Sequence, residues 1–312
     1  MILKRRQLAP PRVTTGLERR WLDPNKGLLK MFERDVDFVV SRYVYPHLLG
    51  LWNPYSWILL KRFSLAEVSV TPPLWPTGLA PLNVLLLSDI HTGIFLKPKV
   101  LADVIRLLMD VGPDLVAVAG DIVTGRASDL DDSLAALAPL SRAPLGAWFC
   151  YGNHDYFGDD AGPVRERLQS IGIRTLRNES VVLTHGDGEF VIGGIDDLIL
   201  GKPDWAGLVG KYGGPHLLLA HHPDFFYQAV RHRVALTLSG HTHGGQIRPR
   251  WTSPIVRHSE FCLDEGAYVH QASMLVVSRG LGSVGLPLRY GADPEAVLIQ
   301  VQSPESTVRE KP

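Results

Sequence analysis

The chain has 312 residues, of which 45% are hydrophobic and 21% are charged, a balance that excludes a disordered or fibrous protein and is ordinary for a globular one. Its 32 basic and 32 acidic residues give a formal net charge of zero, so overall basicity does not indicate nucleic-acid binding and we expect no nucleic-acid partner. The two cysteines, Cys150 and Cys262, stand far apart, which excludes a disulfide framework and favours a reducing compartment.

The N-terminal segment is basic. Residues 1–34 carry nine basic and three acidic side chains, which suits either an anionic surface or a solvated terminus. No apolar stretch follows closely enough to form a secretory signal peptide. We therefore expect a cytoplasmic protein, either free or held peripherally at the inner face of the membrane.

An uncharged, aromatic-rich stretch comes next, YVYPHLLGLWNPYSWILL at residues 43–60. Its length reaches the lower limit for a membrane-spanning helix, roughly 18 residues. However, Pro46, Asn53 and Pro54 interrupt it, and its tyrosines and tryptophans suit the membrane–water interface. Two interpretations stay open: a surface-lying or hairpin element in peripheral contact with a membrane, and a helix pair packed on the main domain. We assign residues 1–71 to this N-terminal region.

The main domain follows a cluster of proline and glycine, PPLWPTGLAP, which predicts a linker at residues 72–82. Short apolar runs then predict buried strands, and they alternate with runs of helical periodicity. The expected strands are 83–88, 114–120 and 145–152, and the expected helices are 97–112, 129–140 and 162–172. From residue 180 onward, strand-like runs follow one another with little helix between them. The pattern predicts an α/β fold over residues 83–303, with a pair of sheets flanked by helices, and a tail at 304–312.

Side chains able to bind metals follow five of the predicted strands. The motifs are DIH (Asp89, His91), GD (Asp121), GNHD (Asn153, His154), AHHPD (His221) and GHTHGG (His241, His243). Each motif alone is weak, because Asp, Asn and Gly are common in turns. Five such motifs, each after a buried run, are not explained by turns. Because ligands gather outside the carboxyl ends of strands in such folds, we expect one common site.

The chemistry of these groups indicates a metal centre. Carboxylate, imidazole and amide ligands without thiolate suit Mn²⁺, Fe²⁺ or Zn²⁺ rather than a soft ion such as Cu(I). The set exceeds the needs of one ion, so we predict two divalent ions that share a carboxylate. His241 and His243 occupy alternate positions, and an extended strand would place both on one face. Gly244 and Gly245 would then let the backbone approach the ions without a Cβ clash.

The five motifs, in this order over residues 83–246, resemble the signature blocks of the calcineurin-like metallophosphoesterases. The resemblance implies a four-layer αββα sandwich of two mixed sheets flanked by helices, with a dinuclear metal centre. The later segment VSRGLGSVGLPLRYGADPEAVLIQV, residues 277–301, is similar to the ending of a bacterial membrane-associated branch. That branch includes UDP-2,3-diacylglucosamine pyrophosphatase-type enzymes.

The resemblance also implies individual roles. The first ion would be held by Asp89, His91 and His243, and the second by Asn153, His221 and His241, with Asp121 bridging them. His154 would be a catalytic histidine that is not a ligand, acting beside Asn153 and Asp121. Neighbouring residues in a strand point to opposite faces, so only one of His221 and His222 is expected to bind metal. The family pattern favours His221 and leaves His222 a structural role.

One position departs from a known pattern. In the protein-phosphatase branch, an aspartate three residues after the bridging aspartate pairs with the catalytic histidine, whereas this chain has Thr124 there. The difference argues against a protein phosphatase and leaves the partner of His154 unassigned.

The predicted activity is hydrolysis of a phosphoester or phosphoanhydride by a metal-bridging hydroxide, with His154 protonating the leaving oxygen. The basic, aromatic N-terminal region motivates a lipid-linked substrate such as UDP-2,3-diacylglucosamine. The main alternative is a soluble phosphodiesterase or phosphatase that acts on a nucleotide or another small substrate. A non-catalytic scaffold with this fold is disfavoured because every predicted ligand is present.

Overall fold

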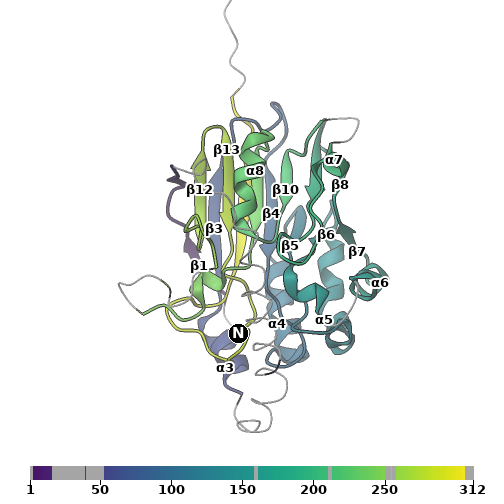
Figure 1. Ribbon diagram of the computed structural model, residues 1–312, viewed down its shortest axis with the longest axis vertical. Helices are drawn as coiled ribbons and strands as arrows, with labels where there is room; N and C mark the ends of the chain where they lie inside the picture. The colour runs from purple at the N-terminus through teal and green to yellow at the C-terminus, as the bar shows by residue number, and fades with distance from the viewer. Residues whose placement is uncertain are drawn as a thin grey trace, which may run out of the picture.

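Two mixed β-sheets face each other at the centre of the molecule (Figure 1). The computed structural model describes residues 3–15, 39, 53–157, 161–209, 213–249, 254 and 258–305. Within these residues, the first sheet has the strand order β1-β3-β14-β4-β5-β6-β7 and the second β2-β12-β13-β11-β10-β9-β8. Most neighbouring strands are parallel, but β14 runs antiparallel to β4, β12 to β13, and β8 to β9.

The elements have the following bounds. The first sheet contains β1 (Lys4–Gln7), β3 (Ser64–Val70), β4 (Leu82–Leu87), β5 (Leu115–Ala119), β6 (Ala147–Cys150), β7 (Ile173–Leu176) and β14 (Glu295–Val301). The second contains β2 (Arg12–Val13), β8 (Glu179–His185), β9 (Gly188–Gly194), β10 (Leu217–Leu219), β11 (Leu236–Ser239), β12 (Gly266–His270) and β13 (Ser273–Val277). The α-helices are α3 (Tyr55–Arg62), α4 (Pro98–Met109), α5 (Leu134–Leu137), α6 (Gly162–Ser170), α7 (Trp205–Leu208) and α8 (Phe226–Arg231).

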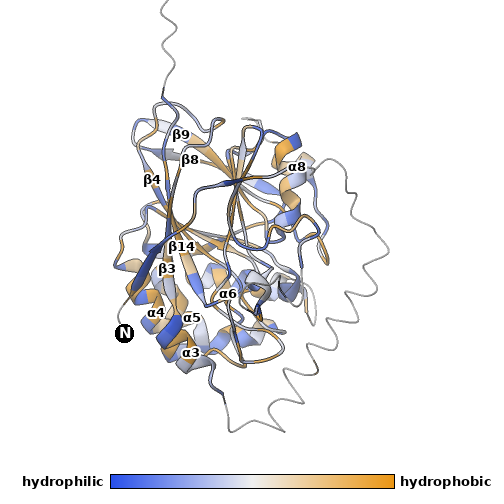
Figure 2. Cartoon of the chain, turned by 90° about the vertical axis from the view of Figure 1, so that its left-hand side faces the viewer, coloured by the Kyte–Doolittle hydropathy of each residue, from blue (hydrophilic) through white to orange (hydrophobic). Residues whose placement is uncertain are grey.

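Helices cover the outer face of each sheet, which gives four layers. Figure 2 shows α3, α4 and α5 on the opposite side of the molecule from α8. Three apolar clusters fill the spaces between layers: one under α4, one between the sheets around Trp75 and Trp148, and one under α8. The central strands β5, β6, β10 and β11 are buried along their whole length, as expected of sheets covered on both sides. The predicted αββα sandwich of two mixed sheets is confirmed.

The helix expected at residues 129–140 forms only in part. The described chain has a 3₁₀ segment η4 (Ala127–Ser133), one turn of α-helix in α5, and a second 3₁₀ segment η5 (Ala138–Arg142). Pro139 lies at the start of η5 and has no backbone N–H to continue an α-helix, so the α-helical hydrogen bonding ends there.

The N-terminal region contributes strands to both sheets. Strand β3 pairs with β14 along its whole length, from Ser64 opposite Glu295 to Val70 opposite Val301, and β1 extends the same sheet. The predicted linker at 72–82 therefore connects two strands of one sheet, β3 and β4, although we placed the start of the main domain at residue 83.

The aromatic stretch at 43–60 is described from residue 53 onward, so residues 43–52 lie outside the described residues. The described part ends in α3, which buries Tyr55 and Leu59 against the first sheet and leaves Trp57 55% and Leu60 39% exposed. Over the described ranges of the chain, no helix has the length and apolar character needed to cross a membrane.

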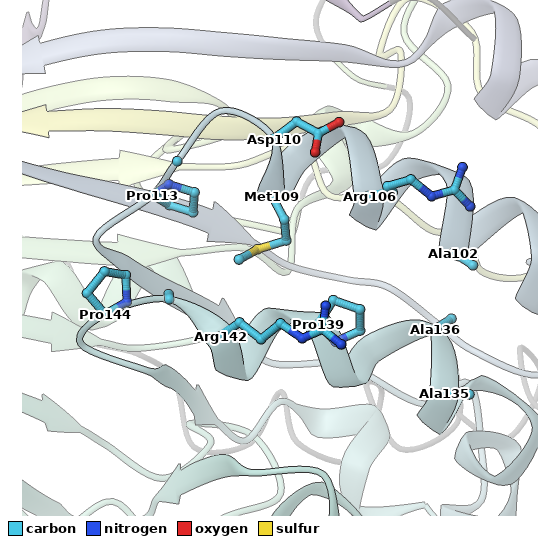
Figure 3. Close-up of a pocket in the computed structure, with 12 residues that line it drawn as sticks. Ala102, Arg106, Met109, Asp110, Pro113, Ala135, Ala136, Pro139, Arg142 and Pro144 are labelled. Atoms are coloured by element: carbon cyan, nitrogen blue, oxygen red, sulfur yellow. The ribbon is translucent and has the colours of Figure 1, made fainter.

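A surface pocket of about 650 Å³ lies between α4 and η5, with Arg106, Met109 and Arg142 among its lining residues (Figure 3). It lies where the chain enters β5 and β6, since Pro113 and Pro144 precede those strands. The predicted metal-binding motifs follow the other ends of the same strands. The pocket and the predicted site are therefore at opposite ends of the sheet.

Candidate metal centre

The predicted site residues follow the carboxyl ends of five strands. Strands β4, β5 and β6 are parallel neighbours in the first sheet, and β10 and β11 are parallel neighbours in the second. The residues that follow them in the chain are, in order, Asp89 and His91, Asp121, Asn153 and His154, His221, and His241 with His243. The parallel arrangement brings these side chains to the same end of both sheets, as the sequence predicted.

One group of side chains consists of Asp89, His91 and His243. Their carboxylate and ring-nitrogen atoms lie within 4.8 Å of one another, and all three residues are buried. His243 Nε2 is 3.4 Å from Asp89 Oδ1 and 3.2 Å from His91 Nε2. A carboxylate and two imidazole nitrogens thus converge on one point.

A second group consists of Asp121, His221 and His241. Asp121 Oδ2 is 3.1 Å from His221 Nε2, which in turn is 3.3 Å from His241 Nδ1. The same Asp121 Oδ2 is 3.8 Å from His91 Nε2 of the first group. Asp121 therefore lies between the two groups, the position expected for a shared carboxylate.

Asn153 follows β6 next to this second group. The N–H of the next residue, His154, donates to Asp121 Oδ1 (2.8 Å), which holds the turn against the carboxylate. Asn153 Oδ1 is a buried acceptor that meets no hydrogen-bond donor among the described residues. An orphaned buried acceptor is costly, and a cation would satisfy it. The residues present therefore fit a pair of divalent ions.

The backbone at the site adopts a conformation that side chains disfavour. Five of the predicted residues have positive φ, between 47° and 70°: Asp89, His91, Asp121, His241 and His243. Left-handed non-glycine residues are uncommon, cost free energy, and gather at active sites and ligand clamps. Their concentration at these strand ends is a structural sign of function.

The turn after β11 differs from the extended strand we assumed for His241 and His243. The strand ends at Ser239, and both histidines follow in left-handed turns that direct them to different groups. Gly244 and Gly245 also have positive φ, and a Cβ there would collide with Arg279 and Pro254 rather than with the metal-binding atoms. We predicted that these glycines make room for the ions, and this was wrong: they make room for Arg279 and Pro254.

Burial and charge shape the ionisation of the site. Burial raises the pKa of Asp89 to about 6 and lowers the pKa of His91 to about 3. Burial also opposes ionisation of Asp121, but His221 and then His154 outweigh it and lower the pKa of that carboxyl. For His221, burial disfavours the cation, yet Asp121 raises its pKa to about 10. The negative charge of Asp121 thus favours a cation at this point.

Neighbouring groups orient the imidazoles. His221 Nδ1 donates to the carbonyl of Ala119 (2.8 Å), which directs Nε2 at Asp121 and leaves that nitrogen to bind a cation once its proton is displaced. The buried Arg289 donates to His243 Nδ1 (2.9 Å) and to the carbonyls of Arg279 and Gly282. Because a guanidinium only donates, the proton of a neutral His243 sits at Nε2, and a cation bound there would displace it.

The partner of His154 is a backbone group. His154 Nδ1 donates to the carbonyl of Thr124 (2.8 Å), while the Thr124 hydroxyl donates to the carbonyl of Thr92. The position that lacks an aspartate therefore still orients the histidine, but without adding negative charge. His154 is 7% exposed, and its ring packs edge-on against His91 with centroids 4.7 Å apart.

Three further residues at the site were not assigned from the sequence: Arg289, His258 and Asp155. The Asp155 carboxylate accepts four backbone N–H groups, from Gly152 and from residues 121–123, and so joins the turns after β5 and β6. His258 packs against His241 with ring centroids 5.6 Å apart. Of these three residues, only Asp155 carried a signal in the sequence, because it is the last residue of the GNHD motif. Arg289 and His258 lie in irregular loops whose spacing carries no periodic pattern.

Comparison with known proteins gives consistent matches. The family described as calcineurin-like phosphoesterase matches residues 82–245. The metallophosphoesterase YkuE of Bacillus subtilis, described as uncharacterized, is 31% identical over 270 residues, covering 84% of this chain and 89% of the relative. The phosphodiesterase YaeI of Escherichia coli is 31% identical over 260 residues, covering 79% and 89%. A transmembrane protein with metallophosphoesterase domain from Danio rerio is 32% identical over 246 residues, covering 74% of this chain but 55% of that relative.

Proposed function

The chain belongs to the calcineurin-like phosphoesterase family and is a metal-dependent phosphoester hydrolase, and from this premise we propose that it works with two divalent ions held at the strand ends. The first ion is held by Asp89, His91 and His243 and the second by Asn153, His221 and His241. The observation that carries this assignment is the place of Asp121, whose Oδ2 faces His91 Nε2 on one side and His221 Nε2 on the other.

Bound divalent ions supply charge stabilisation at the phosphoryl group and lower the pKa of water. The protein supplies orientation and a proton. Asn153 Oδ1 faces no competing donor among the described residues and is available as a ligand. His154 holds its Nδ1 proton on the Thr124 carbonyl, which leaves Nε2 to exchange a proton with the leaving oxygen. The edge-on contact with His91 keeps the ring beside the first group of ligands.

For the substrate, we propose a phosphate or pyrophosphate attached to a lipid, such as UDP-2,3-diacylglucosamine. Exposed apolar side chains beside the site support this: Trp57 and Leu60 on α3, and Leu286, Leu288 and Tyr290 on the loop before β14. Tyr55 of α3 donates to the carbonyl of Gly282 (2.8 Å), which joins the helix to that loop, and Figure 1 shows the two close together. The same loop carries Arg289, which contacts His243.

A soluble small substrate is the second candidate function. The Escherichia coli relative is named a phosphodiesterase, which favours a phosphodiester as the bond that is cleaved. This candidate needs no apolar surface, so it predicts that the exposed residues of α3 and the loop before β14 contribute nothing to turnover.

A hydrolysis screen separates the two candidates. With Mn²⁺ added, we expect turnover of the general substrate bis-(p-nitrophenyl) phosphate, abolished by a chelator and restored by Mn²⁺. Under the lipid-linked proposal, a lipid pyrophosphate in mixed micelles gives a higher kcat/KM than nucleotide diphosphate sugars without an acyl chain. A preference for the soluble compounds supports the second candidate, and no turnover of any phosphorylated compound contradicts both.

Vesicle binding tests the apolar surface directly. We expect the protein to co-float with vesicles that contain anionic lipid, because Trp57 is exposed and Lys61 stacks on it to supply positive charge beside the apolar ring (4.5 Å). Trp57→Ser and Leu286→Ser should each weaken binding roughly tenfold through lost apolar burial. Val209, 52% exposed at the end of α7, gives the matched control Val209→Ser, which should bind as the wild type does. Equal flotation of all variants would show that these apolar residues do not bind the membrane.

A further inference from the structure

A further histidine, His258, lies at the edge of the metal centre and has no role in the mechanism given above. His258 stands nearly perpendicular to His241, with an interplanar angle of 72° and ring centroids 5.6 Å apart. Its side chain is partly exposed, unlike the buried imidazoles of the two ligand groups. His258 therefore lies between the buried centre and solvent.

The loop that carries His258 is anchored by the AHHPD motif. Asp224, the last residue of that motif, is 1% exposed, and its carboxylate accepts hydrogen bonds from the Ser259 hydroxyl and from the Glu260 N–H (2.8 Å). Ser259, itself 2% exposed, also accepts the N–H of Leu263 (2.9 Å). The segment that supplies His221 to the second ligand group thus also fixes the residue next to His258.

His258 lies outside the candidate groups of metal ligands. Among the described residues, the groups whose donor atoms lie within 4.8 Å of one another do not include His258. His154 packs edge-on against His91 at 4.7 Å, but its ring nitrogen, unlike those of His258, belongs to such a group, with His91 and Asp121. Histidines outside the two ligand groups thus pack against a member of each: His154 against His91, and both His222 and His258 against His241.

We propose that His258 is a substrate-contacting residue whose ring N–H donates to a phosphoryl oxygen on the side of the centre formed by His221 and His241. The inference rests on the proposed function, because it requires that a phosphoryl group bind at this centre. A phosphoryl oxygen is a charged acceptor, and an imidazole has an N–H to donate in either protonation state. Asp224 and Ser259 are positioning residues, because they act through the loop.

The test is binding of inorganic phosphate to the Mn²⁺-loaded protein, followed by calorimetry. His258→Ala should keep the metal content of the wild type by elemental analysis and weaken phosphate binding roughly ten- to a hundredfold, the range for loss of a hydrogen bond to a charged group. His258→Gln, which restores an N–H donor, should recover part of the affinity. His232→Ala is the matched control, because His232 is an exposed histidine stacked on Trp205.

Ser259→Ala provides a second variant that leaves the imidazole in place. It should weaken phosphate binding less than His258→Ala does, and the double variant should bind no more weakly than His258→Ala alone, since both changes remove the same contact. Unchanged phosphate affinity in His258→Ala would overturn the inference, and so would loss of metal from that variant, which would make His258 a ligand. If the wild type binds phosphate but hydrolyses nothing, the proposed function fails while the phosphate comparison still decides the role of His258.

Discussion

Replacement of Asp121 by asparagine is expected to remove metal from both halves of the centre and to lower kcat/KM by on the order of 10³-fold or more. The reason is the position of one oxygen. Asp121 Oδ2 faces His221 Nε2 at 3.1 Å and His91 Nε2 at 3.8 Å, so a single carboxylate serves both groups of ligands. Loss of its charge removes several kcal/mol of the stabilisation that bound ions provide.

Asparagine is the informative substitution because it keeps the shape of the turn. Its Oδ1 still accepts the N–H of His154, as Asp121 Oδ1 does at 2.8 Å. The loss should therefore come from charge and not from misfolding. The measurement is metal content after Mn²⁺ loading and dialysis, together with kcat/KM for bis-(p-nitrophenyl) phosphate. Asp187→Asn, in the exposed turn between β8 and β9, is the matched control. Full metal content with wild-type turnover in Asp121→Asn would disprove the shared role.

The sequence predicted which residues meet because the rule that brings them together is topological. Side chains at the carboxyl ends of parallel strands gather at one edge, and the apolar runs before Asp89, Asp121 and Asn153 identified those strands. The same reasoning placed His221, which follows β10, beside His241 and His243, which follow β11. Register and neighbour order were not needed for this prediction, only the ends of the strands.

What the sequence did not reveal depends on backbone conformation and on distant contacts. No local pattern predicts that His241 and His243 take left-handed φ values of 70° and 52°, since only the surrounding packing imposes them. Nor does the type of residue at Thr124 matter for His154, because the partner is its backbone carbonyl. Strand β3, which was not predicted, pairs with β14 more than 200 residues away in the chain, and no local pattern reveals such a pairing.

Replacement of His154 by alanine is expected to lower turnover by about 10²–10⁴-fold while the protein keeps its metal. The structure allows a competing role, because His154 also lies within 4.8 Å of His91 and Asp121 in a possible third set of ligands. Two contacts fix the orientation of the ring in either role. The Thr124 carbonyl holds Nδ1, and Phe157 packs on the ring with centroids 4.2 Å apart, so the ring is fixed beside the first group.

Metal content and the choice of leaving group together separate these two roles of His154. A proton donor matters most when the departing oxygen is strongly basic, so His154→Ala should lose more turnover with an alkyl phosphate ester than with a p-nitrophenyl ester, whose leaving group needs little protonation. If His154 were instead a ligand, His154→Ala would lower the turnover of both substrates equally and would reduce the metal content in elemental analysis. Loss of metal from His154→Ala would therefore make His154 a ligand. Asn153 would then be the first residue to remove from the proposed ligands, because its buried oxygen is linked to the site only through the adjacent turn.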